Sequence, residues 1–470
     1  MNTLVKGMTK QANKTYTQNG MKINKSSNSA IVDLFFAIGA SRGKDILPLF
    51  QRAVAEDMDL AIRVALYARD VREGMGERKL FRDIVRDFAH TDFEAAKRVV
   101  TRVPDLGRFD DLFAFVGTPV EKEALDLFQF HLESGNALAA KWAPREKSAN
   151  RALAAKLRKH MGLKPREYRK MLANATTVVE TQMCAQSWGD IEFSHVPSVA
   201  SARYQRAFLR NDEARYRAYL GALEKGDPNV KINAGAVYPY DIVRSLYTGN
   251  VTAAQEQWKA LPDWIPNDRS FVPLIDVSGS MGVRVSGNVS AMDIAVSLGL
   301  YCAQNAKSAF KDKFITFTSD PSWIDVGGMK LKQAVETTRR APWGMSTDVE
   351  KAYELIVNTA VKYNVPPEDM PEFLIIFSDM QFNSATRGAN SVNKNIRQKF
   401  EAAGYEVPKI VYWNLRDYGA NTPVEFTKDG VALVSGFSPS LMKSVLSMDT
   451  AKFTPLNIVL ETVMKPRYDW

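Results

Sequence analysis

Three oxygen-bearing side chains stand at alternate positions in the segment Asp276-Val277-Ser278-Gly279-Ser280. The segment directly follows 271–275, a short apolar run of the kind that forms strands. In a turn that leaves a strand, residues 276, 278 and 280 can converge, bringing together one carboxylate and two hydroxyls. These are hard oxygen ligands, which suit Mg²⁺ or Mn²⁺. The spacing therefore predicts a divalent-cation site, with Mg²⁺ as the first choice, at an exposed strand end.

Two later segments place further oxygen ligands in similar positions. Thr347 precedes the helical stretch 348–363, and Asp379 follows the apolar run 373–377. The alternative interpretation is that all these side chains only cap turns, as Asp, Ser and Thr commonly do. A cation held by only two carboxylates stays electrophilic and could activate water, but no nearby residue in the sequence is an evident general base. Binding is therefore favoured over catalysis.

After residue 265, short apolar runs alternate with helical stretches. This alternation predicts a parallel, doubly wound sheet, in which ligands bind at the carboxyl ends of the strands. The strand-like runs are 271–275, 314–317, 373–377 and 410–413, and the helical stretches are 291–306, 331–339, 348–363 and 393–403.

Before residue 265, the sequence has a helical pattern. Apolar side chains recur with a period of 3.6, as at positions 80, 81, 84, 85 and 88, and no clear strand alternation is present. Helices in series with short loops predict an α-solenoid, although no repeat of fixed length is recognisable. The Pro- and Asp-containing segment 261–270 separates the two patterns. We therefore expect a polar segment over 1–28, a helical module over 29–265 and an α/β domain over 266–470.

The positive charge is concentrated in the helical part. The chain has a net charge of +9, from 62 Lys and Arg and 53 Asp and Glu. Residues 266–470 contain 22 residues of each sign, so the whole excess belongs to residues 1–265. Such an asymmetry points to contact with a polyanion, while a solvated lysine-rich surface explains it equally well.

The densest basic stretch is 141–170, in which Glu146 and Glu167 are the only acids. Its aromatic residues Trp142 and Tyr168 could add surface on which single-stranded bases stack. The stretch is therefore a candidate RNA interface, the alternative being a solvated face of the solenoid. His195 is a further candidate contact, although a lone loop histidine is more often structural or merely exposed. The candidate RNA-binding residues are Lys141, Arg145, Lys147, Arg151, Lys156, Arg158, Lys159, Lys164, Arg166, Arg169, Lys170 and His195.

Taken together and in order, Asp276, Ser278, Ser280, Thr347 and Asp379 resemble the metal-ion-dependent adhesion site (MIDAS) of a von Willebrand factor A domain. A basic helical half followed by such a domain resembles the Ro autoantigen family, whose TROVE module is a ring of HEAT-like helices. The resemblance is nearest to a branch of TROVE relatives classed as a domain of unknown function. It rests on the segments 17–20, 34–36, 67–78, 108–112, 141–145, 196–200 and 231–239.

The resemblance implies an α + α/β protein, a helical ring joined to an A domain that packs where the ring's two ends meet. It further implies binding of noncoding or misfolded RNA and a non-catalytic role in RNA quality control or scaffolding, including the handing of RNA to a nuclease. The sequence departs from the Ro pattern after 162–172, where the His-x-Lys-Pro-like element is absent. RNA binding as a class is therefore the expectation, rather than a partner of the Y-RNA type.

Composition excludes several other classes of protein. Cys184 and Cys302 are the only cysteines, too few for a disulfide scaffold or a CxxC metal site. No run approaches the roughly 18 apolar residues of a membrane helix, and the first 28 residues lack the apolar block of a secretory signal. We expect a cytoplasmic monomer. Two rival functions remain open: a protein-interaction module whose metal captures an acidic partner residue, and a metal-dependent nuclease.

Overall fold

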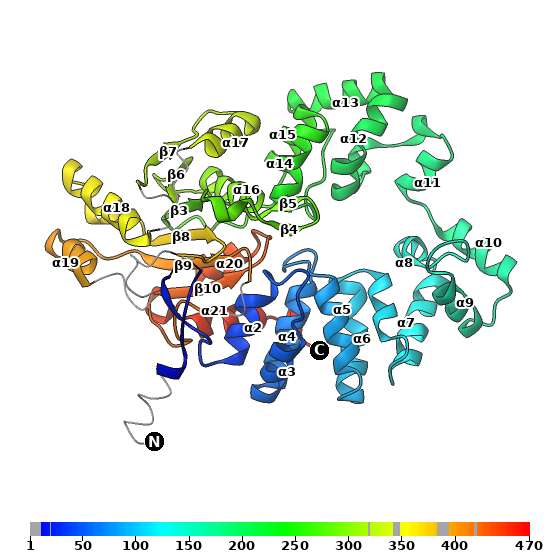
Figure 1. The fold of residues 1–470 in the computed structure, drawn as a ribbon. Coiled ribbons are helices and arrows are strands. Elements are labelled where there is room, and N and C mark those ends of the chain that lie inside the picture. The colour runs from blue at the N-terminus through cyan, green and yellow to red at the C-terminus, as the bar shows by residue number, and fades with distance from the viewer. Residues whose placement is uncertain (1–10, 19, 318–319, 342–347, 383–393, 418–420) are drawn as a thin grey trace. The chain divides into compact units, whose positions relative to one another are not determined.

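The computed structural model describes residues 11–18, 20–317, 320–341, 348–382, 394–417 and 421–470. Its contacts group the chain into two compact units (Figure 1). The first unit consists of Met1–Val64 and Val237–Arg467, and the second of Ala65–Ala236 and Tyr468–Trp470. This grouping differs from a linear division at residue 265, because helices from both ends of the predicted helical module pack with the sheet.

A six-stranded sheet forms the centre of the first unit, in the order β10-β9-β8-β3-β6-β7. Neighbouring strands are parallel except β7, which is antiparallel to β6. The chain builds β3, β6 and β7 outward in one direction and then crosses back to β8, so the strand order reverses between β3 and β8. The strands are β3 (Phe271–Asp276), β6 (Lys313–Phe317), β7 (Trp323–Asp325), β8 (Phe373–Ser378), β9 (Lys409–Asn414) and β10 (Val431–Ser435).

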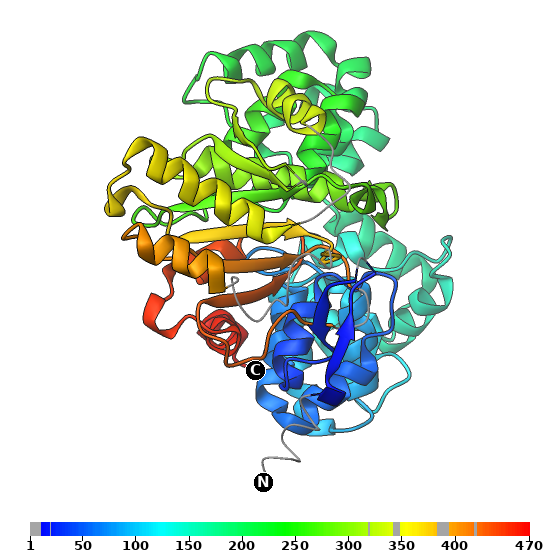
Figure 2. The same ribbon diagram turned by 60° about the vertical axis from the view of Figure 1, so that its left-hand side comes forward.

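The predicted α/β architecture after residue 265 is confirmed. All six residues of β3 and of β8 are buried, which is why these strands appear in the sequence as continuous apolar runs. α18 and α19 lie side by side in this part of the unit (Figure 2). The helices are α16 (Ala291–Asn305), α17 (Leu331–Arg340), α18 (Val349–Tyr363), α19 (Lys394–Ala402), α20 (Leu441–Ser447) and α21 (Pro455–Val463).

α16 crosses between the first two strands and packs closely on the sheet. A capping box in which Ser290 and Asp293 bond each other's backbone amides starts the helix. A Cβ atom on Gly299 would lie 2.3 Å from Cδ1 of Ile275, so only glycine permits this close approach of α16 to β3. The tight packing holds the carboxyl end of β3 in place.

Helices that precede residue 265 also cover the sheet unit. α2 (Ala30–Ile38) is buried from residue 31 to 38 and packs on β10 and α21. α14 (Pro239–Thr248) packs on α16, and α15 (Val251–Lys259) contacts α17. α3 (Leu47–Glu56) belongs to the same unit and packs on α2. The first and last helices of the predicted helical module therefore both belong to the unit that contains the sheet.

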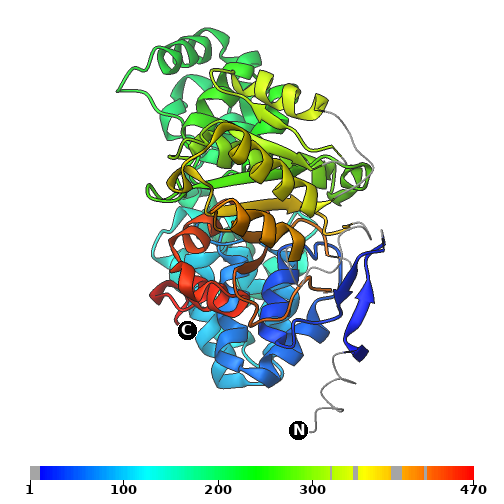
Figure 3. The ribbon, with the colours of Figure 1, turned by 90° about the vertical axis from the view of Figure 1, so that its left-hand side faces the viewer.

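A β-hairpin lies within the expected N-terminal polar segment. It consists of β1 (Lys14–Tyr16) and β2 (Lys22–Asn24), which pair antiparallel as a separate two-stranded ribbon (Figure 3). Asn24 also forms a bridge with Thr422. The segment is thus tied to the C-terminal part of the first unit.

The described residues of the second unit form helices and loops and include no strand. The predicted period is confirmed in α5, whose residues 80, 81, 84, 85 and 88 are all buried. α4 (Met58–Arg69) runs from the first unit into the second, and the short helices are η1 (Phe109–Phe115), η2 (Trp188–Asp190) and η3 (Phe193–His195). The α-helices are α5 (Lys79–Phe88), α6 (Phe93–Leu106), α7 (Glu121–Glu133), α8 (Ala137–Trp142), α9 (Arg151–His160), α10 (Pro165–Ala175), α11 (Val179–Cys184), α12 (Ser198–Asn211) and α13 (Glu213–Glu224).

A buried network of ion pairs joins α4, α5 and η1. The side chain of Asp111 is fully buried and accepts hydrogen bonds from Nε of Arg69 at 2.7 Å and Nε of Arg82 at 2.6 Å. The backbone amide of Arg108 donates to the same carboxylate at 2.8 Å. The guanidinium of Arg108 lies over the ring of Trp142 in α8, 3.5 Å from its centroid. Segments 67–78, 108–112 and 141–145, which carry part of the family resemblance, thus contribute to the core.

Among the described residues, no helix is both long and apolar enough to cross a membrane.

Candidate metal centre and basic surface

The predicted metal ligands lie where β3 and β8 end, at the reversal of strand order. Asp276 is the last residue of β3, and Asp379 directly follows β8. Both carboxylates have 0% exposure, and Ser278 has 5%. The expectation of an exposed strand end is therefore wrong for these residues, whose side chains are buried in the fold. Ser280 is half-buried, and only the adjacent Gly279 and Gly282 are exposed.

Hydrogen bonds hold the segment in the predicted turn. The backbone amide of Ser278 donates to Oδ1 of Asp276 at 2.9 Å, and the hydroxyl oxygens of Ser278 and Ser280 lie 3.1 Å apart. Ser378, a residue that the sequence did not single out, donates its hydroxyl to Oδ2 of Asp276 at 2.6 Å. Each oxygen of Asp276 therefore accepts one neutral hydrogen bond.

Burial and a neighbouring carboxylate disfavour the ionised form of Asp276. Burial, followed by the negative charge of Asp379, raises the pKa of Asp276 to about 7, although hydrogen bonds from Ser278 and Ser378 act in the opposite direction. The interactions that favour its charged form come from neutral groups, so a bound cation would supply the missing positive charge. Carboxylate and hydroxyl oxygens are the donors that Mg²⁺ and Mn²⁺ prefer, and the residues present fit such an ion.

Four of the five predicted ligands therefore share one region of the sheet: Asp276, Ser278, Ser280 and Asp379. Thr347 lies outside the described residues. Within the described ranges, no group of three or more His, Cys, Asp or Glu side chains could hold a metal. A cation at this site would thus depend on two carboxylates supplemented by hydroxyls.

The tip of the N-terminal hairpin contacts the segment that carries Asp379. The hydroxyl of Thr17 donates to the carbonyl of Phe382 at 2.6 Å, and the amide of Gln18 donates to the side-chain oxygen of Gln381 at 2.7 Å. Within the segment, the amide of Gln381 donates to Oδ1 of Asp379 at 3.2 Å. More than 360 residues separate the two sides of this contact in the sequence, so no local sequence pattern could predict it.

The candidate RNA-binding residues divide into two groups, of which the first is engaged in the fold. Lys141 pairs with Glu180 at 2.9 Å, and Lys156 pairs with Glu121 at 2.5 Å. Arg145 donates to the carbonyl of Ala143 and the hydroxyl of Thr176, and its burial lowers its pKa. Arg158 and Arg169 both pair with Glu146. Ion pairs or hydrogen bonds with neighbouring residues therefore occupy the charged groups of these five side chains, wholly or partly.

The second group is exposed to solvent and makes no ion pair with any described residue. On α10, Arg166 and Lys170 are four positions apart and therefore share a face of the helix. On α9, Arg151 is the first residue of the helix, and Lys159 lies in its last turn. The full group is Lys147, Arg151, Lys159, Lys164, Arg166 and Lys170.

The aromatic residues of this stretch do not provide the expected stacking surface. Tyr168 has 0% exposure, and its hydroxyl donates to the carbonyl of Pro144 at 3.0 Å. It shares the buried face of α10 with Leu172, four residues on, and this helical spacing could have identified it as a core residue. Trp142 is half-buried, and Arg108 covers one face of its ring.

His195 ends η3 in the second unit and is exposed, while the preceding Phe193 and Ser194 are buried. Its backbone amide donates to the carbonyl of Glu192 at 3.0 Å. Its role in contacting RNA stays a prediction.

The helical part and the mixed sheet together define a Ro-like fold with an α/β domain. The crystal structure of the RO (RSR) protein of Deinococcus radiodurans is similar over 93% of this chain and 100% of that chain, with a TM-score of 0.51 and 14% sequence identity. At this identity the likeness concerns the fold alone, and it supports the expected Ro-like fold at the level of a helical part with an α/β domain.

Comparison of sequences identifies the family. Residues 17–87 and 137–265 match the model of a domain of unknown function (DUF2828), and residues 270–462 match that of another (DUF7788). The uncharacterized protein L728 of Acanthamoeba polyphaga mimivirus is 30% identical, and the match covers 97% of this chain and 88% of the viral protein. The chain therefore belongs to the same family as this viral protein.

Proposed function

We propose that this protein binds RNA, as the Ro-type resemblance implies, and that it does so through the exposed cations of α9, α10 and their flanking loops. The proposed ligand is noncoding or misfolded RNA, and the proposed role is non-catalytic, in RNA quality control or scaffolding. One observation carries the proposal: six exposed Lys and Arg side chains lie within 24 residues, and none has an acidic partner among the described residues.

The chemistry of this surface favours contacts with phosphate over contacts with bases. Free ammonium and guanidinium groups release condensed counterions from RNA when they bind its phosphates. With Tyr168 buried and Trp142 partly covered, the aromatic residues of 141–170 offer little surface for stacking on bases. The expected binding is therefore strong at low salt and has little preference for sequence.

The proposal predicts which cations contribute to affinity. Replacing Lys159, Arg166 and Lys170 together by Ala should weaken binding of several unrelated single-stranded RNAs by similar factors, measured by fluorescence anisotropy. The control variant changes Lys332, Lys443 and Lys452, exposed lysines of the sheet unit, and alters the net charge by the same amount. Equal affinities of the two triple variants would show that the basic surface is only a solvated face.

We further propose that the buried carboxylates form a MIDAS-type site for Mg²⁺ or Mn²⁺, as in a von Willebrand factor A domain. Asp276, Ser278, Ser280, Thr347 and Asp379 would be the ligands. The raised pKa of Asp276, caused by burial and by the charge of Asp379, supports this assignment. When bound, the ion would supply an electrophilic position for a carboxylate of a protein partner, such as a nuclease that receives the RNA.

Asp276→Asn tests the metal site with a side chain of almost unchanged shape. We expect calorimetry to detect binding of Mg²⁺ or Mn²⁺ to the unchanged protein and a loss of at least about tenfold in affinity in the variant, since one of two charged ligands is removed. Asp293→Asn, which alters a helix cap in the same unit, serves as the control. Undiminished binding in Asp276→Asn would contradict the assignment.

A further inference from the structure

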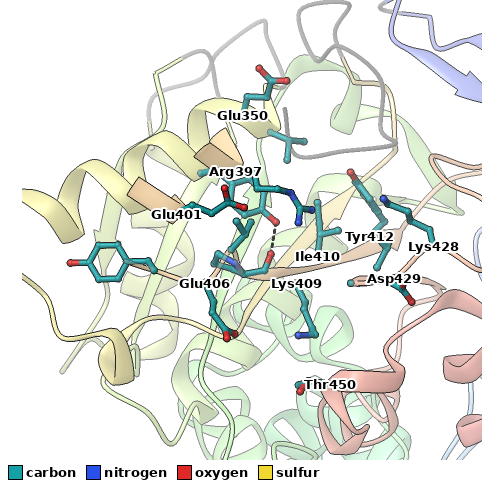
Figure 4. Close-up of a pocket in the computed structure, with 17 residues that line it drawn as sticks. Glu350, Arg397, Glu401, Glu406, Lys409, Ile410, Tyr412, Lys428, Asp429 and Thr450 are labelled. Atoms are coloured by element: carbon teal, nitrogen blue, oxygen red, sulfur yellow. Dashed lines mark hydrogen bonds between the residues drawn. The ribbon is translucent and has the colours of Figure 1, made fainter. Parts of the chain in front are cut away.

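A pocket of about 620 Å³ opens on the face of β9 and β10, next to α18 and α19 (Figure 4). Ile410, Tyr412 and Val431 of the two strands line it, and Tyr353 of α18 and Arg397 of α19 add to its wall. No helix is present between β9 and β10 in the described residues, whereas helices connect the other parallel strands. The crossover between these two strands therefore contributes no described helix to the face that carries the pocket, while α2 and α21 pack on β10. The volume lies in the range that accommodates small ligands.

Tyr412 provides a polar group in this pocket that the protein itself does not use. Its side chain is only 4% exposed, and its hydroxyl makes no hydrogen bond with a described residue. Burial raises the pKa of Tyr412, so the hydroxyl remains a donor at neutral pH. A ligand with an oxygen acceptor in the pocket would receive a hydrogen bond from this hydroxyl.

Three cations from different elements line the same pocket. Arg397 comes from α19, Lys409 begins β9, and Lys428 precedes β10. None of them pairs with an acid among the described residues. In Figure 4, the polar ends of Arg397, Tyr412 and Lys428 are on the same side of the pocket. Two cationic donors and a phenol at one place match the oxygens of a phosphate group.

Two glutamates line the opposite side of the pocket. Glu401 of α19 and Glu406 of the following loop lie away from Tyr412 and Lys428 (Figure 4). Asp429 and Glu350 also line the pocket, so its acidic and basic side chains nearly balance. A simple anion would leave the acidic side without a partner. A ligand with a phosphate at one end and N–H donors at the other would satisfy both sides.

We propose that this pocket binds a nucleoside monophosphate whose base carries an exocyclic amine. The phosphate is held by Arg397, Lys428 and the Tyr412 hydroxyl, and the amine faces Glu401 and Glu406. The site is distinct from the carboxylates of Asp276 and Asp379, which lie at the carboxyl ends of β3 and β8, whereas Lys409 and Val431 begin their strands. The proposal does not depend on RNA binding by the helical unit.

Calorimetric titration of the full chain with AMP, UMP, adenosine and inorganic phosphate tests the proposal. AMP should bind, while UMP, which lacks the amine, and adenosine, which lacks the phosphate, should bind at least about tenfold more weakly. Inorganic phosphate should also bind more weakly than AMP. Absence of AMP binding at concentrations up to about 10 mM would overturn the proposal. Equal affinities for AMP, UMP and phosphate would contradict recognition of the amine by Glu401 and Glu406.

Two variants locate the ligand within the chain. Tyr412→Phe removes one hydroxyl that faces the pocket without changing the shape of the core, and Arg397→Gln changes an exposed residue, so both should fold. Each should weaken AMP binding about tenfold. Lys399→Gln is the matched control, because Lys399 is on the same helix but pairs with Glu354 and does not line the pocket. Unchanged affinity in Tyr412→Phe and Arg397→Gln would place AMP elsewhere and contradict the proposal.

Discussion

Two fully buried aspartates, Asp111 and Asp276, differ in how their charge is balanced. Asp111 accepts hydrogen bonds from the guanidinium groups of Arg69 and Arg82, so the protein itself supplies the opposite charge. Asp276 accepts hydrogen bonds from a backbone amide and a hydroxyl and is close enough to Asp379 for its pKa to rise. The first carboxylate is therefore a structural residue, and the second has the character of a ligand for an external cation.

This difference predicts that Asp111→Asn is strongly destabilising. The change leaves the buried guanidinium of Arg69 without its counter-charge, a situation that costs about 3–5 kcal/mol. Urea unfolding of the full chain, followed by circular dichroism, measures the loss. Asp83→Asn removes the partner of the exposed Lys79 and should cost less than about 1 kcal/mol. Similar stabilities of the two variants would contradict the structural role of the network.

Among the structural elements, the N-terminal hairpin has the clearest proposed link to the metal site. Its residue Thr17 is buried and donates a hydrogen bond to the carbonyl of Phe382, three residues after Asp379. Met380, between them, has a positive φ of 64°, an uncommon conformation for a residue other than glycine. We infer that the hairpin holds this segment in the conformation that directs Asp379 toward Asp276.

Thr17→Val should therefore weaken Mg²⁺ binding about threefold to tenfold, since a net hydrogen bond contributes about 0.5–1.5 kcal/mol. Calorimetry with the full chain measures the effect. Thr15→Val, on the same hairpin but without a hydrogen bond to residues 379–382, is the matched control. If both variants bind Mg²⁺ like the unchanged protein while Asp276→Asn does not, the metal site stands and the positioning role of the hairpin is refuted.

The elements show which features a single sequence reveals. The runs at 271–275 and 373–377 identified β3 and β8 because buried parallel strands are apolar on both faces. The spacing within 276–280 identified three candidate ligands because the pattern is local. By contrast, the hairpin contact and the ion pairs of Lys141 and Lys156 involve partners that are distant in sequence. The periodicity of apolar residues carries no information about such contacts. β7 and β10 were not predicted at all.

For the whole molecule, the decisive property is the location of the excess positive charge. The sequence places the entire excess of positive charge in residues 1–265. Of the eleven basic residues in 141–170, six are exposed in the structure and form no ion pair with a described acid. If these cations bind phosphates, the affinity for RNA must depend steeply on salt concentration, because each contact releases counterions.

The salt dependence of RNA affinity tests this central claim most directly. For single-stranded RNA, each phosphate contact contributes about −0.7 to the slope of the logarithm of the association constant against the logarithm of salt concentration. The variant with Ala at positions 159, 166 and 170 should therefore show a slope flatter by about 2 than the unchanged protein, while the variant changed at 332, 443 and 452 should keep the original slope. A slope that is the same in all three proteins would contradict RNA binding at this surface.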